Sequence, residues 1–100
     1  MNNVGQNFIR HHAPDGRSWY DLGYYKPETL GRRIENAMPL HGALPLVVLS
    51  ETRPYTTTLE DTWEEAKRVA SAFLSLGLQP GDRIALHVPN WYECPICYLA

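Results

Sequence analysis

The segment Arg-Ile-Ala-Leu-His-Val at residues 83–88 limits the possible folds of this chain more than any other. In an extended chain, Ile84, Leu86 and Val88 lie on one face. The opposite face carries Ala85 and a histidine, so both faces are mostly apolar. Such a strand is typical of a parallel sheet that helices cover on both sides. The sequence therefore predicts an α/β fold with a sheet and helices beyond this one strand.

A long amphipathic helix is predicted over residues 59–76, just before that strand. Thr58 can accept a hydrogen bond from the backbone of Asp61, whose carboxylate can reach back in the manner of a capping box. The apolar stripe consists of Leu59, Trp63, Ala66, Ala70, Phe73 and Leu74. Gly77 suits the left-handed residue that often follows a helix. Gln-Pro-Gly-Asp at residues 79–82 then predicts a type II turn.

Three shorter elements are predicted upstream. Thr29 can cap a helix that has one apolar face. Pro39 is expected to end this helix. Residues 46–49 are predicted to form a strand, because their valines favour extended backbone. A polar turn at residues 50–53 and a return strand at residues 55–57 would complete a β-hairpin.

Another helix is predicted after residues 83–88, with Asn90 as its cap and Glu93 as the capping-box partner. Pro95 would be the fifth residue of this helix, where a missing backbone donor can bend it. Cys94 and Cys97 would then take the fourth and seventh positions after the cap.

Residues 1–28 are interpreted as an extended arm, since they show no sustained period. Their aromatic residues are too many for a disordered tail, which indicates that they cover a larger body. No secretory signal is recognisable, and the longest apolar run, residues 43–49, is far shorter than the roughly 20 residues of a membrane helix. A formal net charge of −2 gives no field that would gather nucleic acid. We therefore expect a cytoplasmic protein without a transmembrane segment.

From Gly23 to Ala100 the chain resembles the N-terminal region of the adenylate-forming acyl- and aryl-CoA synthetases, also called AMP-binding enzymes. The ordered features are a Thr-led helix, Leu-Gly-Leu, Pro-Gly-Asp-Arg, an apolar strand, Pro-Asn, Glu and Leu-Ala. The matching positions are Thr58, Ala70, Leu76, Gly77, Pro80, Gly81, Asp82, Arg83, Pro89, Asn90, Glu93, Leu99 and Ala100. The chain departs from the family at Thr62, where Leu is usual, and at Cys94 and Pro95, which replace bulky apolar residues.

This resemblance implies that residues 29–100 are the opening helices, hairpin and first buried strand of a large N-terminal domain, which would be incomplete here. Family members join a carboxylic acid to ATP with the help of Mg²⁺ and pass the acyl group to coenzyme A. The phosphate loop, ribose-binding acid and acyl-contacting lysine lie further along family chains. We therefore assign no catalytic, cofactor-binding or metal residue. The 100 residues alone are expected to be an inactive scaffold that binds none of these cofactors.

The main alternative is a thioredoxin- or glutaredoxin-like redox module that uses Cys94 and Cys97, because Cys-Pro-x-Cys at a helix start can favour a thiolate. Such a module needs a further sheet and a cis-proline after the motif, and buried cysteines also serve as small apolar residues. Zinc binding with His87 or with His11 and His12 is disfavoured, since a structural site needs four ligands at recognisable spacing. A non-catalytic interaction module is the third reading.

Overall fold

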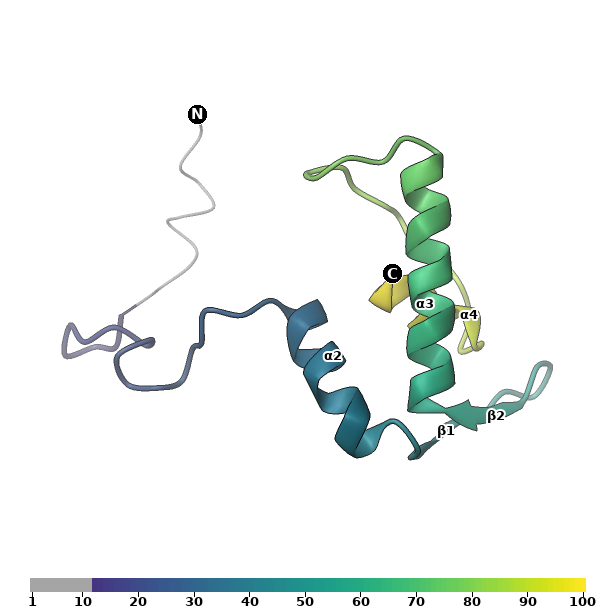
Figure 1. Ribbon diagram of the computed structural model, residues 1–100, viewed down its shortest axis with the longest axis horizontal. Coiled ribbons are helices and arrows are strands. Elements are labelled where there is room, and N and C mark those ends of the chain that lie inside the picture. Colours follow the sequence, from purple (N-terminus) through teal and green to yellow (C-terminus); the bar gives the residue numbers. More distant parts are fainter. Residues whose placement is uncertain (1–11) are drawn as a thin grey trace. The chain divides into compact units, whose positions relative to one another are not determined.

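The computed structural model describes residues 12–100, so the expectations for residues 1–11, including His11, lie outside the described part. The chain divides into two compact units, Met1–Leu30 and Gly31–Ala100. The elements are α2 (Leu30–His41), β1 (Pro45–Val48), β2 (Tyr55–Thr58), α3 (Leu59–Ser75) and α4 (Glu93–Leu99) (Figure 1). No helix of residues 12–100 is long and apolar enough to cross a membrane.

The described part of the first unit consists mainly of turns and bends, and the assignment of residues 1–28 to an arm stays a prediction. An isolated antiparallel bridge pairs His12 with Ser18. The Trp19 ring lies 5.7 Å from that of Tyr24 and 6.4 Å from that of Tyr25, measured between ring centroids. The aromatic side chains of this segment therefore pack on one another. Whether they also cover a larger body stays a prediction.

Helix α2 extends further than the sequence analysis predicts, because it ends at His41 and contains Pro39. A proline lacks one backbone donor, but its fixed φ is compatible with a helix. The last turn is closed by the N–H of Gly42, which donates to the carbonyl of Met38 at 2.7 Å. A Cβ added at Gly42 would lie only 2.6 Å from that same carbonyl oxygen, so a residue without a side chain is needed here.

The predicted hairpin is confirmed, with strand ends that differ by one residue from the expected ones. Strands β1 and β2 form a two-stranded antiparallel sheet in which Pro45 pairs with Thr58 and Val48 with Tyr55. The N–H of Leu59 donates to the carbonyl of Leu44 at 2.9 Å. The hairpin thus leads directly into α3.

The start of α3 confirms the predicted cap. Thr58 has extended backbone angles, and its hydroxyl oxygen accepts a hydrogen bond from the N–H of Asp61 at 3.1 Å. Such a bond satisfies one of the backbone donors that the first turn of a helix leaves unpaired. Acidic side chains at Glu60 and Asp61 also favour this positive end of the helix.

The end of α3 follows the pattern of a Schellman motif. Gly77 has a φ of +95°, and its N–H donates to the carbonyl of Leu74 at 3.0 Å. The N–H of Leu78 donates to the carbonyl of Phe73 at 3.2 Å, which is the second bond of this motif. The predicted role of Gly77 is therefore confirmed.

The turn at residues 79–82 also has the predicted geometry. The N–H of Asp82 donates to the carbonyl of Gln79 at 3.0 Å, and Gly81 has a φ of +95°. A type II turn requires a positive φ at this third position, where glycine is favoured. The side chain of Asp82 adds a bond, because its carboxylate accepts from the N–H of Gln79 at 2.8 Å.

The prediction of a buried strand at residues 83–88 is wrong for this structure. These residues are not part of any sheet. Ile84 is 53% exposed and Leu86 is 41% exposed. A strand needs a neighbouring strand for its backbone bonds, and in residues 12–100 the only paired strands are β1 and β2, which pair with each other. Residues 12–100 are thus a mixture of helices and a small antiparallel sheet, and the expected parallel sheet is not found among them.

The predicted cap of the last helix is also wrong. Helix α4 begins at Glu93, and its N-cap residue Tyr92 makes no side-chain capping bond. The side-chain amide of Asn90 instead donates to the carbonyl of Leu49 at 3.0 Å. Pro95 becomes the third residue of α4, within the first turn, where its missing donor costs no helical hydrogen bond. The expected bend is therefore not required.

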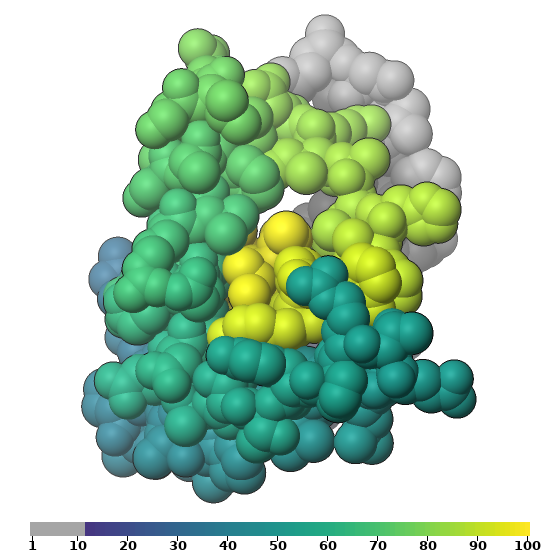
Figure 2. Space-filling model, turned by 90° about the vertical axis from the view of Figure 1, so that its right-hand side faces the viewer, coloured from purple at the N-terminus to yellow at the C-terminus, as the bar shows by residue number. Residues whose placement is uncertain are grey.

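The core of the second unit lies where α3 meets α4 and the hairpin. Figure 2 shows the yellow atoms of α4 enclosed between green α3 and the teal hairpin. The buried residues of these elements are Val48, Thr62, Trp63, Ala66 and Ile96. They come from all three of these elements, so α4 is held on the rest of the unit by this small core.

Candidate functional site

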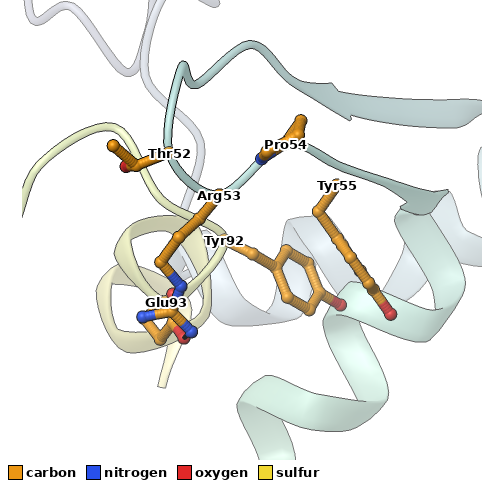
Figure 3. A pocket seen from close by; sticks show the side chains of 6 residues that line it. All are labelled: Thr52, Arg53, Pro54, Tyr55, Tyr92 and Glu93. Atoms are coloured by element: carbon orange, nitrogen blue, oxygen red, sulfur yellow. Dashed lines mark hydrogen bonds and ion pairs between the residues drawn. The ribbon is translucent and has the colours of Figure 1, made fainter.

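A hollow of about 510 Å³ lies where the loop between β1 and β2 meets the start of α4 (Figure 3). Its lining residues are Thr52, Arg53, Pro54, Tyr55, Tyr92 and Glu93. The loop and α4 are about forty residues apart in sequence. Packing of α4 on α3 brings them together, so the fold of the whole second unit builds this hollow.

The loop is shaped by Ser50, which lies just after β1. Its hydroxyl oxygen accepts hydrogen bonds from the N–H of Thr52 at 3.3 Å and from that of Arg53 at 3.1 Å. Serine hydroxyls commonly stabilise turns in this way. The bonds fix the backbone at Arg53, from which its side chain extends toward α4 (Figure 3).

Arg53 makes two contacts with the segment before and at the start of α4. Its Nη2 lies 2.5 Å from Oε1 of Glu93, and its guanidinium carbon lies 4.6 Å from the centre of the Trp91 ring. The indole N–H of Trp91 in turn donates to the hydroxyl of Thr52 at 3.3 Å. Because the two charged side chains are 52% and 43% exposed, the ion pair contributes at most about 1 kcal/mol to stability.

The aromatic wall of the hollow consists of Tyr55 and Tyr92, whose ring centroids are 4.5 Å apart. The hydroxyl of Tyr92 donates to Oγ1 of Thr62 at 3.3 Å. Thr62 is 2% exposed, and its own hydroxyl donates to the carbonyl of Thr58 at 2.9 Å. Leucine, which is usual at this position in the resembled family, could not accept the bond from Tyr92.

Two further hollows flank α3. One, of about 330 Å³, shares Tyr55 and Tyr92 with the first hollow and also contains Arg68, which pairs with Glu65. The other, of about 470 Å³, lies between α2 and α3. It contains the pair of Lys67 and Glu64, 2.8 Å apart.

The electrostatics of the hollow between α2 and α3 depend on its carboxylates. The hydrogen bond from Lys67 to Glu64 raises the pKa of Lys67, and the charges of Glu64 and Glu35 add to this. Trp63 also lines this hollow, and its buried indole N–H has no acceptor within residues 12–100. That nitrogen is sealed from solvent, so a ligand in the hollow could not reach it without a rearrangement.

Polar side chains of the first hollow are already paired with other residues, so they offer few free groups for catalysis or ligand binding. The guanidinium of Arg53 is already paired with Glu93, and the hydroxyl of Tyr92 with Thr62. This arrangement fits a structural junction between the hairpin and α4. Within residues 12–100, no group of three or more His, Cys, Asp or Glu side chains could hold a metal ion.

No site residue is predicted from the sequence, and nothing in the sequence indicates this junction. Arg53 and Glu93 have ordinary sequence contexts, and only the tertiary fold brings them together. Of the residues weighed for redox or zinc chemistry, Cys94 and Cys97 are free and half-buried on α4. His87 lies exposed in the irregular segment before it.

Comparison with known proteins gives one match. A family model described as AMP-binding enzyme matches residues 38–100. The match begins near the end of α2 and includes both strands, α3, the turn at residues 79–82 and α4. No curated protein and no solved structure matches the chain.

Proposed function

This chain belongs to the AMP-binding enzyme family, and on that premise we propose that its parent protein is an ATP-dependent carboxylic acid:CoA ligase of the cytoplasm. In the first step a carboxylate attacks the α-phosphate of ATP, forming an acyl-adenylate and releasing pyrophosphate. In the second, the thiol of coenzyme A takes the acyl group and AMP leaves. Mg²⁺ would neutralise phosphate charge during the first step.

Within that enzyme, the proposed role of these residues is structural. The observation that carries this proposal is the family match over residues 38–100, a region whose charged and hydroxyl groups at the hairpin junction already pair with one another. We further propose that Mg²⁺, ATP and the acyl group bind in other parts of the parent protein, because the phosphate loop, ribose-binding acid and acyl-contacting lysine lie further along the chains of the resembled family.

Residues 29–100 would form the opening part of a large N-terminal domain, preceded by an arm at residues 1–28. The exposed apolar residues Ile84 and Leu86 support this proposal. Exposed apolar side chains that alternate along a chain suit a strand covered by other elements. In the parent protein, residues 83–88 would pair with a further strand of the same domain.

A thermal-shift measurement tests the structural role. The melting temperature of the 100-residue chain should not change when ATP and Mg²⁺ are added together, because a ligand stabilises a protein only by binding its folded state. A rise of several degrees would show a nucleotide site in these residues and overturn the proposal.

The ligase activity is tested on the full product of the gene. With a panel of carboxylic acids, labelled pyrophosphate should enter ATP only when a suitable acid is present, and added coenzyme A should yield a thioester. Exchange without thioester formation would overturn the choice of coenzyme A as acceptor. Absence of exchange with every acid would overturn the ligase assignment.

A further inference from the structure

Two thiols lie three residues apart on α4 and have no role in the junction described above. Cys94 is the second residue of this helix and Cys97 the fifth, and Ile96 between them is the buried residue that holds α4 on the core. Both cysteines are free and half-buried, so a small reagent can reach them. Residues three apart share one face of a helix.

Helix geometry brings the two cysteines close to the distances of a disulfide, without reaching them. Cα atoms three residues apart in a helix are about 5 Å from each other, which is within the usual disulfide range. The Cβ atoms are about 5–6 Å apart, whereas a disulfide needs about 3.5–4.5 Å. Closing the bond therefore requires the first turn of α4 to change shape.

That turn has one short backbone bond, from the N–H of Cys94 to the carbonyl of Trp91 at 3.0 Å, and the backbone after it is held less firmly. Pro95 contributes no donor, and the N–H of Ile96 is 3.5 Å from the carbonyl of Tyr92. The same turn carries Glu93, which is paired with Arg53. A distortion here would therefore act directly on the contact between α4 and the hairpin loop.

From this geometry we propose that Cys94 and Cys97 form a reversible dithiol–disulfide pair whose closure loosens the docking of α4. One sulfur attacks a small disulfide such as oxidised glutathione, releasing one glutathione thiol and forming a mixed disulfide. The second sulfur then attacks the protein sulfur of that bond and releases the second glutathione thiol. The two cysteines together lose two electrons and two protons, and the reagent gains them.

Because closure requires a change in the shape of α4, the disulfide would be strained. The pair therefore suits a reversible response to redox conditions rather than a permanent cross-link. Strained and accessible disulfides are reduced more readily than relaxed ones. In a reducing compartment the dithiol form, with α4 docked, would predominate. An oxidising shift would close the bond and weaken the junction of Arg53 and Glu93.

The test measures the equilibrium between dithiol and disulfide at a series of ratios of reduced to oxidised glutathione. Free thiols are trapped with iodoacetamide, and intact mass then separates chains with two adducts from bridged chains with none. Cys94→Ser and Cys97→Ser are the matched controls, because each can form only the mixed disulfide. The series is run in buffer and again in 6 M urea.

Coupling between disulfide closure and folding is reciprocal. If closure lowers the stability of the folded state by a given factor, the folded state lowers the equilibrium constant for closure by the same factor. The oxidation constant in buffer is therefore expected to be lower than in urea by about 5-fold or more, the lower limit of typical couplings. Equal constants, or a larger constant in buffer, would overturn the proposal. So would the absence of any adduct-free chain at every ratio.

Discussion

The hydroxyl of Tyr92 donates a hydrogen bond to Oγ1 of Thr62, and this bond joins the residue before α4 to the second turn of α3. Thr62 in turn donates to the carbonyl of Thr58, so a chain of two hydrogen bonds runs from the α4 junction to the cap of α3. These two hydrogen bonds and the apolar contacts of the buried Ile96 together stabilise the docking of α4.

Thr62→Val keeps the shape of the side chain but removes the acceptor for Tyr92. The change also removes the bond from Thr62 to the carbonyl of Thr58, so we expect the free energy of unfolding to fall by about 1–3 kcal/mol, the usual cost of two such hydrogen bonds. Urea unfolding followed by circular dichroism measures it. Tyr92→Phe removes the donor, and the double variant should lose less than the sum of both single losses. Strictly additive losses would show that the two hydroxyls do not interact.

The ion pair of Arg53 and Glu93 should contribute little to the free energy of unfolding. Both side chains are about half exposed, so Glu93→Gln is expected to lower the free energy of unfolding by less than about 1 kcal/mol. Because salt screens exposed charges, the difference between the variant and the parent chain should nearly vanish in 1 M NaCl. A loss that persists in salt would contradict this account and point to a non-ionic role of the carboxylate.

Local features of this fold could be predicted because neighbouring residues determine them. The cap by Thr58 needs only the backbone three residues later, and Gly77 and Gly81 needed only their own positive φ. Each prediction rested on a short stretch of sequence whose geometry has few alternatives.

Features with distant partners could not be predicted in the same way. Asn90 is predicted to cap the last helix, but its side-chain amide donates a hydrogen bond to the carbonyl of Leu49, which is 41 residues away. The pattern of residues 83–88 was read as a buried strand, but a strand forms only where another strand is available to pair with it. The contact between Arg53 in the hairpin loop and Glu93 of α4 could not be predicted for the same reason, because neither residue has a distinctive sequence context.

Two glycines test how much of the stability depends on backbone conformation alone. A Cβ added at Gly77 or Gly81 would meet no atom within 4 Å, yet both residues have a φ of +95°. Gly77→Ala and Gly81→Ala should each lower the free energy of unfolding by about 1 kcal/mol, because residues with a Cβ avoid this region. Urea unfolding of each variant measures the loss.

Gly31 is the matched control for these two substitutions. It lies in the first turn of α2 without a positive φ, and an added Cβ there also meets no atom within 4 Å. Gly31→Ala should therefore leave stability unchanged or raise it by up to about 1 kcal/mol. A similar loss in all three variants would show that open space and φ do not explain the effect.

The last prediction concerns Asp15 and Arg17 in the first unit. The side chain of Arg17 donates to the Asp15 carboxylate from Nε at 2.7 Å, and its backbone N–H donates at 3.1 Å. These bonds lower the pKa of Asp15 below its ordinary value of 3.8. A lowered pKa means that the folded turn favours the charged carboxylate. The resulting stabilisation is present above pH 3.8 and is lost as the pH falls through the folded-state pKa.

An NMR titration of the Asp15 carboxyl carbon measures this directly, and its midpoint should lie below 3.8. Arg17→Met removes the side-chain donor and the positive charge but leaves an unbranched side chain, so the midpoint should rise toward the ordinary value. An equal midpoint in the parent chain and the variant would contradict the assignment of Arg17 as the main cause.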